Sequence, residues 1–480
     1  MAMRSALRRV RGASGLFAIV AVTVAIAAPV AGADEPDPGV AVGDSIAGAD
    51  SPAAADTFYD PPAGYESEAP GTILKSRPVV VKALEVFPVN SQAWQLLYRT
   101  TDADGNAYAA VTTVLIPDGP AKPRPLLSYQ MAYDSIARDC MPSYALQYSS
   151  PAGLLDPGNQ SALALPPWEM AFAASGLAQG WAVSIPDPGG IDDRFLTPRV
   201  MGYTTLDGIR AAENFAPLGL PGADTKTAMW GYSGGGIATS WAAELQPAYA
   251  PELNIAGAAI GAPVADLGAA LHSANGRLLG GLIPIGVAAL EKDSPEAAAR
   301  LDSYLTPAGQ GIVAAAAYQC VGRNVASNLM LTVPTLLNAP LDTVLADPVI
   351  HQAIAERSHG QTTPTAPVYL YNGVNDEVSP IGPVDALVQN YCAHGASVTY
   401  TRDAFPDVIS DHTIVDVTAA GGAFAWLQRA LNNPQPVQPD GCTTTTVAST
   451  LLDPTGLAAL PDFAAGTVET MLGQALGAGR

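Results

Sequence analysis

The chain has little charge, and most of that charge is of one sign. Only 14% of its 480 residues are Asp, Glu, Lys or Arg, and 44 acidic residues outnumber 23 basic ones, which gives a formal net charge of −21 at pH 7. A surface this acidic repels a phosphate backbone, so nucleic acid is excluded as a partner. The composition is typical of a protein that stays soluble in an external medium.

Long apolar runs are missing except near the N-terminus. Residues 1–33 carry four arginines, an apolar run over residues 16–28, and Ala31-Gly32-Ala33. That run is shorter than the roughly 20 residues of a membrane-spanning helix, and the small residues fit a cleavage site, so we predict a signal peptide removed near Ala33. Its removal leaves 19 basic against 44 acidic residues, a net charge of −25. We therefore expect a secreted monomer without a transmembrane span, whose contact with a lipid–water interface is peripheral.

Cysteine is scarce, and its spacing does not suggest a metal site. The four cysteines are Cys140, Cys320, Cys392 and Cys442, and neither C-x-x-C nor H-x-x-x-H occurs. In an exported protein this favours two disulfides, for which three pairings are possible. No metal ligand set is evident.

A glycine-rich turn is the strongest motif. Residues 227–230 are apolar and read as a strand, residues 236–243 read as a helix, and Gly231-Tyr232-Ser233-Gly234-Gly235 lies between them. A serine at a strand–turn–helix junction adopts a strained backbone that exposes its hydroxyl above the sheet, and the glycines allow strand and helix to cross closely. This predicts a nucleophile elbow with Ser233 as nucleophile; the alternative is a glycine-rich loop with a buried structural serine.

The rest of the chain alternates strands with helices, which indicates an α/β protein with a doubly wound, mostly parallel sheet. The leading strands look antiparallel, and the later ones are short and almost wholly apolar, as in parallel strands buried on both faces. The predicted strands cover residues 79–86, 93–99, 108–116, 125–130, 181–186, 227–230, 255–260, 368–371 and 397–401, and further helices cover residues 168–177, 205–215 and 413–427.

Residues 262–360 interrupt this alternation with Leu, Ala and Gly, and Asp293-Ser294-Pro295-Glu296 is typical of a helix start. We predict a helical cap inserted over the elbow. In the tail, Asp462 is the expected helix cap. The predicted organisation is a signal peptide (1–33), an extended N-terminal arm (34–71), a first core part (72–261), a helical cap (262–360), a second core part (361–433) and a C-terminal tail or flap (434–480).

A serine hydroxyl needs a base, and in this fold the order along the chain is serine, acid, histidine. His412 follows the last predicted core strand and precedes an apolar helix, where a catalytic loop would lie, so it is the candidate base. His394 sits at a helix end closed by glycine, where it meets the helix dipole. His272, His351 and His359 precede the acid and fall in the insertion, so we expect structural or surface roles for them.

The acid should follow the strand at residues 368–371, where Asp376 ends a tight turn; a solvated turn aspartate is the alternative reading. Three other aspartates, Asp403, Asp407 and Asp411, are too close to His412 along the chain to face it easily. The oxyanion hole needs the N–H after the nucleophile, on Gly234, and a second donor from residues 129–135, which lack an HGGG motif.

Several linked motifs resemble the secretory lipase family, typified by fungal lipase A. They are Tyr129-Gln130, Tyr133-Asp134-Ser135, Cys140-Met141-Pro142-Ser143, the Ser233 turn, Asn372-Gly373-x-x-Asp376 and Asp411-His412, and the likeness extends over residues 60–430. The resemblance implies an α/β-hydrolase core, a helical cap and a C-terminal flap. It places Ser233 as nucleophile, Asp376 as acid, His412 as base, and Asp134 with Gly234 as the oxyanion pair. The loop at residues 186–190 and the tail after Cys442 depart from the family pattern.

We therefore predict a secreted serine hydrolase that cleaves carboxylic esters through an acyl-enzyme, most specifically a triacylglycerol lipase acting on lipid or ester substrates. No metal or organic cofactor is implied, because the residues supply nucleophile, base and oxyanion donors. The alternatives are a carboxylesterase for short-chain or polymeric esters and a catalytically silent binding protein on the same fold. Of the three disulfide pairings we favour Cys140 with Cys320, tying the oxyanion-side loop to the cap, and Cys392 with Cys442, tying the tail to the core.

Overall fold

The computed structural model describes residues 53, 55–119, 123–151, 163–406, 408–432 and 441–478. The predicted signal peptide, its cleavage site near Ala33 and most of the N-terminal arm lie outside the described residues. No helix in the described ranges is long and apolar enough to cross a bilayer.

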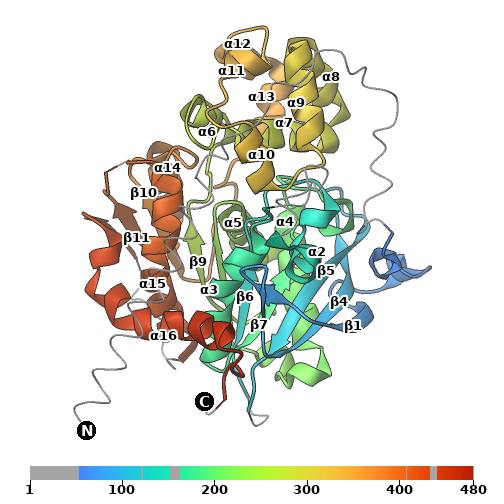
Figure 1. The fold of residues 1–480 in the computed structure, drawn as a ribbon, viewed down its shortest axis with the longest axis vertical. Coiled ribbons are helices and arrows are strands. Elements are labelled where there is room, and N and C mark those ends of the chain that lie inside the picture. The colour runs from blue at the N-terminus through green and yellow to red at the C-terminus, as the bar shows by residue number, and fades with distance from the viewer. Residues whose placement is uncertain are drawn as a thin grey trace.

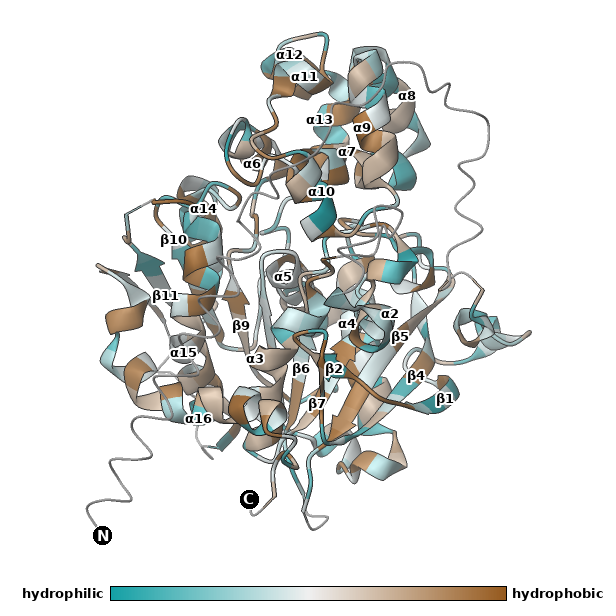
Figure 2. Ribbon diagram, in the orientation of Figure 1, coloured by the Kyte–Doolittle hydropathy of each residue, from teal (hydrophilic) through white to brown (hydrophobic). Residues whose placement is uncertain are grey.

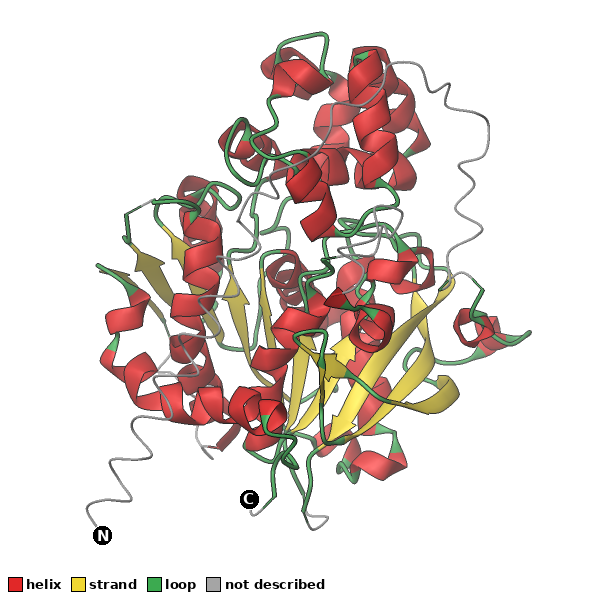
Figure 3. Cartoon of the chain, in the orientation of Figure 1, coloured by secondary structure: helices red, strands yellow, loops and turns green. Residues whose placement is uncertain are grey.

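Within the described residues, ten strands form one large sheet (Figures 1 and 3). β1, β4, β5 and β7 pair antiparallel, and every neighbouring pair from β7 through to β12 is parallel, which confirms the predicted doubly wound, mostly parallel sheet. In spatial order the strands are β1 (Ile73–Val79), β4 (Gln92–Thr101), β5 (Ala107–Ile116), β7 (Ala182–Pro186), β6 (Leu126–Gln130), β8 (Thr227–Tyr232), β9 (Ile255–Gly261), β10 (Val368–Gly373), β11 (Val398–Asp403) and β12 (Cys442–Val447).

Helices cover both faces of the sheet. Because successive side chains of a strand point to opposite faces, Trp230 of β8 packs into one buried cluster and Met229 into the other. Both faces of the central strands are therefore buried, which explains why their sequences are mostly apolar (Figure 2). One face packs against α3 (Pro166–Ala178), α15 (Asp411–Asn432) and α16 (Pro454–Met471), and the other against α4 (Val200–Glu213), α5 (Gly234–Tyr249) and α14 (Ile381–Ala393).

All described helices between β9 and β10 gather beyond one end of the sheet (Figures 1 and 3). Ser294 starts one of them as expected, since its hydroxyl accepts the N–H of Ala297 at 3.3 Å and Pro295 occupies the first turn. We infer that this segment is the cap. Its helices are α6 (Leu267–Ala274), α7 (Leu282–Asp293), α8 (Pro295–Tyr304), α9 (Pro307–Ala316), α10 (Val321–Ser327), α11 (Val333–Leu336), α12 (Leu341–Leu345) and α13 (Pro348–Ala355).

The prediction of a strand over residues 79–86 is wrong. The leading strand ends at Val79, and the chain then forms a short separate hairpin of β2 (Lys82–Ala83) and β3 (Phe87–Pro88). Between them Leu84 and Glu85 have positive φ values of 52° and 63°. Glycine or asparagine normally signals such a turn, so this sequence gave no sign of it.

The tail also differs from its prediction. Asp462 lies inside α16 rather than at its start; the cap is Asp453, whose carboxylate accepts the N–H of Gly456 at 2.8 Å. Residues 442–447, rich in threonine, form β12, which extends the sheet beside β11. The β-branched threonines suit this edge position, whereas the prediction assigned no strand there.

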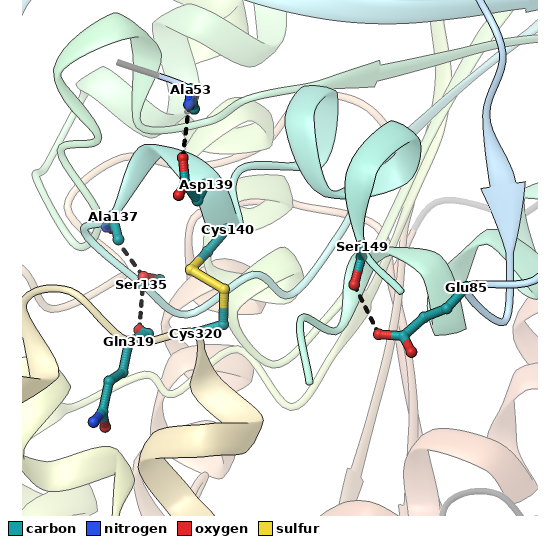
Figure 4. The surroundings of a disulfide bond; sticks show 9 residues. All are labelled: Ala53, Glu85, Ser135, Ala137, Asp139, Cys140, Ser149, Gln319 and Cys320. Atoms are coloured by element: carbon teal, nitrogen blue, oxygen red, sulfur yellow. Dashed lines mark hydrogen bonds between the residues drawn. A yellow bond between two sulfur atoms is a disulfide. The ribbon is translucent and has the colours of Figure 1, made fainter. Parts of the chain in front are cut away.

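The disulfides join the pairs favoured above, Cys140 with Cys320 and Cys392 with Cys442. The first links the loop after β6 to the start of α10, as Figure 4 shows. The second links α14 to the first residue of β12. One bond thus fastens the inserted helices to the core, and the other fastens the tail.

Candidate active site

Ser233 sits in a sharp turn between β8 and α5, with φ 52° and ψ −121°. A non-glycine residue rarely adopts positive φ, so this backbone is strained. A Cβ atom added at Gly231 would lie 2.3 Å from the carbonyl oxygen of Gly235, and one added at Gly235 would lie 2.0 Å from the carbonyl oxygen of Gln130. Only glycine fits at either position. The turn therefore has the geometry expected of a nucleophile elbow.

The structure brings Ser233, His412 and Asp376 together. His412 Nε2 lies 2.7 Å from Ser233 Oγ, and His412 Nδ1 lies 2.9 Å from both carboxylate oxygens of Asp376. Asp376 Oδ1 also accepts the N–H groups of Val378 at 2.9 Å and Ser379 at 2.7 Å, which orient the carboxylate. His412 lies in the first turn of α15 rather than in a free loop.

His412 is buried among negative charges. Burial alone lowers its pKa, but the charge and hydrogen bond of Asp376, together with the charges of Glu377 and Asp416, raise the pKa to about 9. The backbone is held as well: the Tyr232 hydroxyl donates to the carbonyl of His412 at 2.7 Å, and the His412 N–H donates to Glu377 at 3.3 Å. This surrounding stabilises the imidazolium that forms when a histidine takes a serine proton.

Asp134 lies directly over Gly234, the first residue of α5. It is only 7% exposed, it has a φ of 34°, and its Oδ1 has no hydrogen-bond partner among the described residues. A Cβ atom at Gly234 would lie 1.8 Å from that oxygen. Burial raises the pKa of Asp134 to about 6, against the opposing charge of His412. One oxygen of this carboxyl group thus lies beside the nucleophile without a hydrogen-bond partner in the described part of the chain.

The loop that carries Asp134 is held on both sides. The N–H of Ala132 donates to both carboxylate oxygens of Glu169, at 3.1 and 3.2 Å. On the other side the Ser135 hydroxyl donates to the carbonyl of Gln319 at 3.1 Å, next to the Cys140–Cys320 disulfide (Figure 4). The cap and α3 therefore fix the position of this loop.

The other histidines make contacts elsewhere. His394 ends α14, with its Nδ1 2.8 Å from the carbonyl of Asn390, and His272 lies 3.1 Å from the exposed Asp342. His359 is fully buried, 3.5 Å from Glu244. His351 lies on α13.

Two of the aspartates that lie close to His412 in the sequence accept hydrogen bonds from backbone N–H groups. Asp403 accepts the N–H groups of Phe405 and Thr450, and Asp411 accepts that of Asn375. Asp407 lies outside the described residues.

Two cavities meet at Ser233. The smaller, about 130 Å³, lies under the cap helices and includes Ser233, Gly234 and Asp134 in its wall. The larger, about 430 Å³, is enclosed by the β2–β3 hairpin, α3, α10, α15 and α16, and its wall includes Ser233, Asp134 and His412. Among the described residues, His412 lines only the larger cavity.

The larger cavity also contains two carboxyl groups that the sequence reading missed, Glu169 and Asp416. Glu169 is the one charged residue of α3, whose buried face is otherwise mostly apolar, and that signal could have singled it out. Asp416 carries no such signal, because α15 also contains Asp411, His412 and Arg429. Glu377, which contacts the backbone of His412, follows the predicted acid directly in the sequence.

The sheet, its covering helices and the strained serine turn define an α/β-hydrolase fold. The closed state of Candida antarctica lipase A is a solved structure with the same fold: its TM-score is 0.74 at 27% identity, over 86% of this chain and 94% of that chain. The predicted fold is thereby confirmed.

Sequence comparison places the chain within this class. Residues 162–439 match the family model described as secretory lipase. Lipase A of Arthroderma benhamiae is 37% identical over 414 residues, 85% of each chain, and a trichothecene C-3 esterase of Fusarium sporotrichioides is 33% identical over 78% of this chain and 83% of its own. A protein of Mycobacterium tuberculosis named a probable inactive lipase is 38% identical over 75% of this chain and 78% of its own. The chain belongs to the secretory lipase family.

Proposed function

We propose that this protein is a secreted triacylglycerol lipase in which Ser233, His412 and Asp376 form the catalytic triad. The family and its relatives support a carboxylic ester hydrolase that acts outside the cell. The observation that carries the proposal is the continuous chain of contacts from Ser233 Oγ to His412 Nε2 at 2.7 Å and from His412 Nδ1 to Asp376 at 2.9 Å.

In the proposed reaction, Ser233 Oγ attacks the ester carbonyl carbon and its proton passes to His412 Nε2, while Asp376 stabilises the imidazolium. The N–H of Gly234 and the protonated carboxyl of Asp134 donate to the oxyanion. The bond to the alcohol oxygen then breaks, and His412 gives its proton to that oxygen. Water, activated by the same histidine, attacks the acyl-enzyme and releases the carboxylic acid and free Ser233.

The two cavities suit the two halves of an ester. His412 must reach the departing alcohol oxygen to protonate it, and it lines only the larger cavity among the described residues. The alcohol half therefore belongs in the larger cavity. The acyl chain belongs in the smaller one, whose wall is almost entirely aliphatic, as an alkyl chain requires.

The mouth of the larger cavity favours a lipid substrate over a small soluble ester. Three residues of its wall, Val86, Leu329 and Met471, are 52%, 39% and 39% exposed, so the cavity reaches the surface between them. They come from three separate elements. Exposed apolar side chains around a substrate entrance suit contact with the surface of a lipid aggregate.

Met471→Asp is expected to lower the rate on emulsified trioctanoylglycerol, relative to the rate on dissolved p-nitrophenyl acetate, by about tenfold, because a charge replaces an apolar contact with the lipid surface. The ratio of the two rates is the measurement. Leu452→Asp is the control, since Leu452 is 67% exposed in the same tail but lies outside the cavity wall. An equal fall in both variants would contradict the assignment of this face.

A rate profile over p-nitrophenyl esters of increasing acyl length distinguishes a lipase from a short-chain carboxylesterase. A maximum at medium or long chains is expected, and a maximum at acetate would favour a short-chain carboxylesterase; one relative is named a trichothecene C-3 esterase. Absence of both hydrolysis and fluorophosphonate labelling would indicate a catalytically silent protein; another relative is named a probable inactive lipase.

Asp134→Ala is expected to lower kcat by about 10²-fold to 10³-fold, the usual loss for one oxyanion donor. Asp134→Asn should lose less, because an amide still donates. The rate of Asp134→Asn relative to wild type should rise with pH: the amide donates at every pH, whereas the carboxyl donates only while protonated, and burial raises its pKa to about 6. A kcat for Asp134→Ala within a few-fold of wild type, at unchanged Tm, would leave this residue a structural role only.

A further inference from the structure

Glu169 and Asp416 lie in the wall of the larger cavity, and the reaction above uses neither of them. Glu169 belongs to α3 and is 7% exposed. Asp416 belongs to α15 and follows His412 by four residues, which places it one helical turn along the same face. Both carboxyl groups therefore face the space assigned to the alcohol half of the ester.

The two carboxyl groups interact with each other. Burial and the negative charge of Asp416 raise the pKa of Glu169, and burial raises the pKa of Asp416 to about 7 although the charge of His412 opposes this. No Lys or Arg is present in the described wall of the cavity. Two carboxyl groups in the wall of one cavity without a nearby cation resist ionising together, so each favours its neutral form more than an exposed carboxyl does.

Several polar atoms in the wall of the larger cavity have no hydrogen-bond partner within the described residues. Glu169 accepts the Ala132 N–H, but no donor among the described residues reaches the Asp416 carboxyl. Asp134 Oδ1 and Trp168 Nε1, also from residues of the wall, have no partner either in the described part of the chain. Buried polar groups are rarely left unpaired, which points to a ligand with polar groups of its own.

We propose that Glu169 and Asp416 bind free hydroxyl groups on the alcohol half of the substrate, so that among acylglycerols the enzyme prefers the partial esters, which carry a free hydroxyl, to the triacylglycerol, which carries none. The proposal rests on the proposed function and names the substrate class of the same site.

The chemistry of a hydroxyl matches that of the pair. A hydroxyl both donates and accepts a hydrogen bond, and a carboxyl group offers acceptor oxygens and, when protonated, a donor as well. Asp416 lies about 6 Å along the helix axis from His412, within reach of a hydroxyl one or two carbons from the ester oxygen that His412 protonates. An alcohol bearing a phosphate would be repelled by the same charge.

The test compares two octanoate esters, 1-monooctanoylglycerol and ethyl octanoate. Both form the same octanoyl-enzyme, so the ratio of their kcat/KM values reports only the alcohol half. Wild type should prefer the monoacylglycerol by about tenfold or more, the range for charge-assisted hydrogen bonds. Asp416→Leu should bring the ratio near one, mainly through a higher KM for the monoacylglycerol.

Conservative variants separate binding from folding. Asp416→Asn keeps hydrogen-bonding groups and should restore part of the preference. Glu169→Gln keeps an acceptor for Ala132 and should give an intermediate ratio. Asp104→Asn removes one charge from the exposed β4–β5 turn and is the control. An unchanged ratio in folded Asp416→Leu, with Tm near wild type, would overturn the proposal, as would a wild-type ratio near one.

A second measurement needs only the wild-type enzyme. The octanoyl-enzyme partitions between water and added alcohols, and glycerol should capture the acyl group about tenfold better than 1-propanol at equal concentration. Equal or better capture by 1-propanol would refute the polyol subsite even if Asp416→Leu does not fold. Absence of hydrolysis of both esters, together with absence of fluorophosphonate labelling, would instead refute the proposed function.

Discussion

Ser233→Ala is expected to lower kcat for ester hydrolysis by about 10⁶-fold, because the hydroxyl is the atom that bonds to the acyl group. The fold should survive. Alanine is no larger than serine at this strained φ of 52°, and among the described residues the Ser233 hydroxyl is hydrogen-bonded only to His412. Tm and kcat on p-nitrophenyl butyrate are the measurements.

Covalent labelling by a fluorophosphonate gives an independent check of the same residue. The label should bind wild type and be absent from Ser233→Ala. Ser240→Ala is the matched control: Ser240 is a buried serine of the same helix, its hydroxyl lies 3.2 Å from the Tyr391 hydroxyl, and it is in neither cavity wall. Labelling that persists in Ser233→Ala would show that another residue is the nucleophile.

The parts of the site that could be read from the sequence are those with local chemistry. The elbow is a short strand, a glycine turn and a helix in sequence, and close backbone contacts at Gly231 and Gly235 allow no other residue there. Asp376 follows the end of a parallel strand, where side chains of such sheets meet. His412 was predicted from the order of serine, acid and histidine along the chain and from its position between a strand and an apolar helix.

The parts that could not be read depend on packing between distant segments. Glu169 and Asp416 line the same cavity because α3 and α15 cover the same face of the sheet, and no spacing in the sequence encodes that. The turn at Leu84 and Glu85 has no glycine to mark it. The tail strand β12 exists because β11 offers it an open edge, so its threonines alone were ambiguous.

The groups that surround Glu169 and Asp416 could not be predicted from the sequence either. A lone acid in an apolar helix signals a buried charge, but only the fold shows whether that charge meets a lysine, a backbone N–H or an empty space. Here Glu169 meets the Ala132 N–H and Asp416 faces a cavity. The proposed substrate preference therefore rests on the structure, whereas the three residues of the proposed triad were predicted from the sequence.

His412→Ala is expected to lose as much activity as Ser233→Ala, about 10⁶-fold in kcat, since base and nucleophile act as a unit. The double variant should lose no more than either single one. The protein should still fold, because Asp376 keeps the N–H groups of Val378 and Ser379. Imidazole added to the solution should restore part of the rate, because removal of the ring enlarges a cavity that already reaches the surface.

His394→Ala is the matched control for this prediction. Its ring contacts the carbonyl of Asn390 at the exposed end of α14, so the variant should keep its rate within about twofold and lose at most a few tenths of a kcal/mol of stability. Measurement of kcat/KM and Tm for both variants decides between the two histidines. A large loss in His394→Ala, or more than one per cent of wild-type kcat in His412→Ala without imidazole, would mean that the proton is taken by a group other than His412.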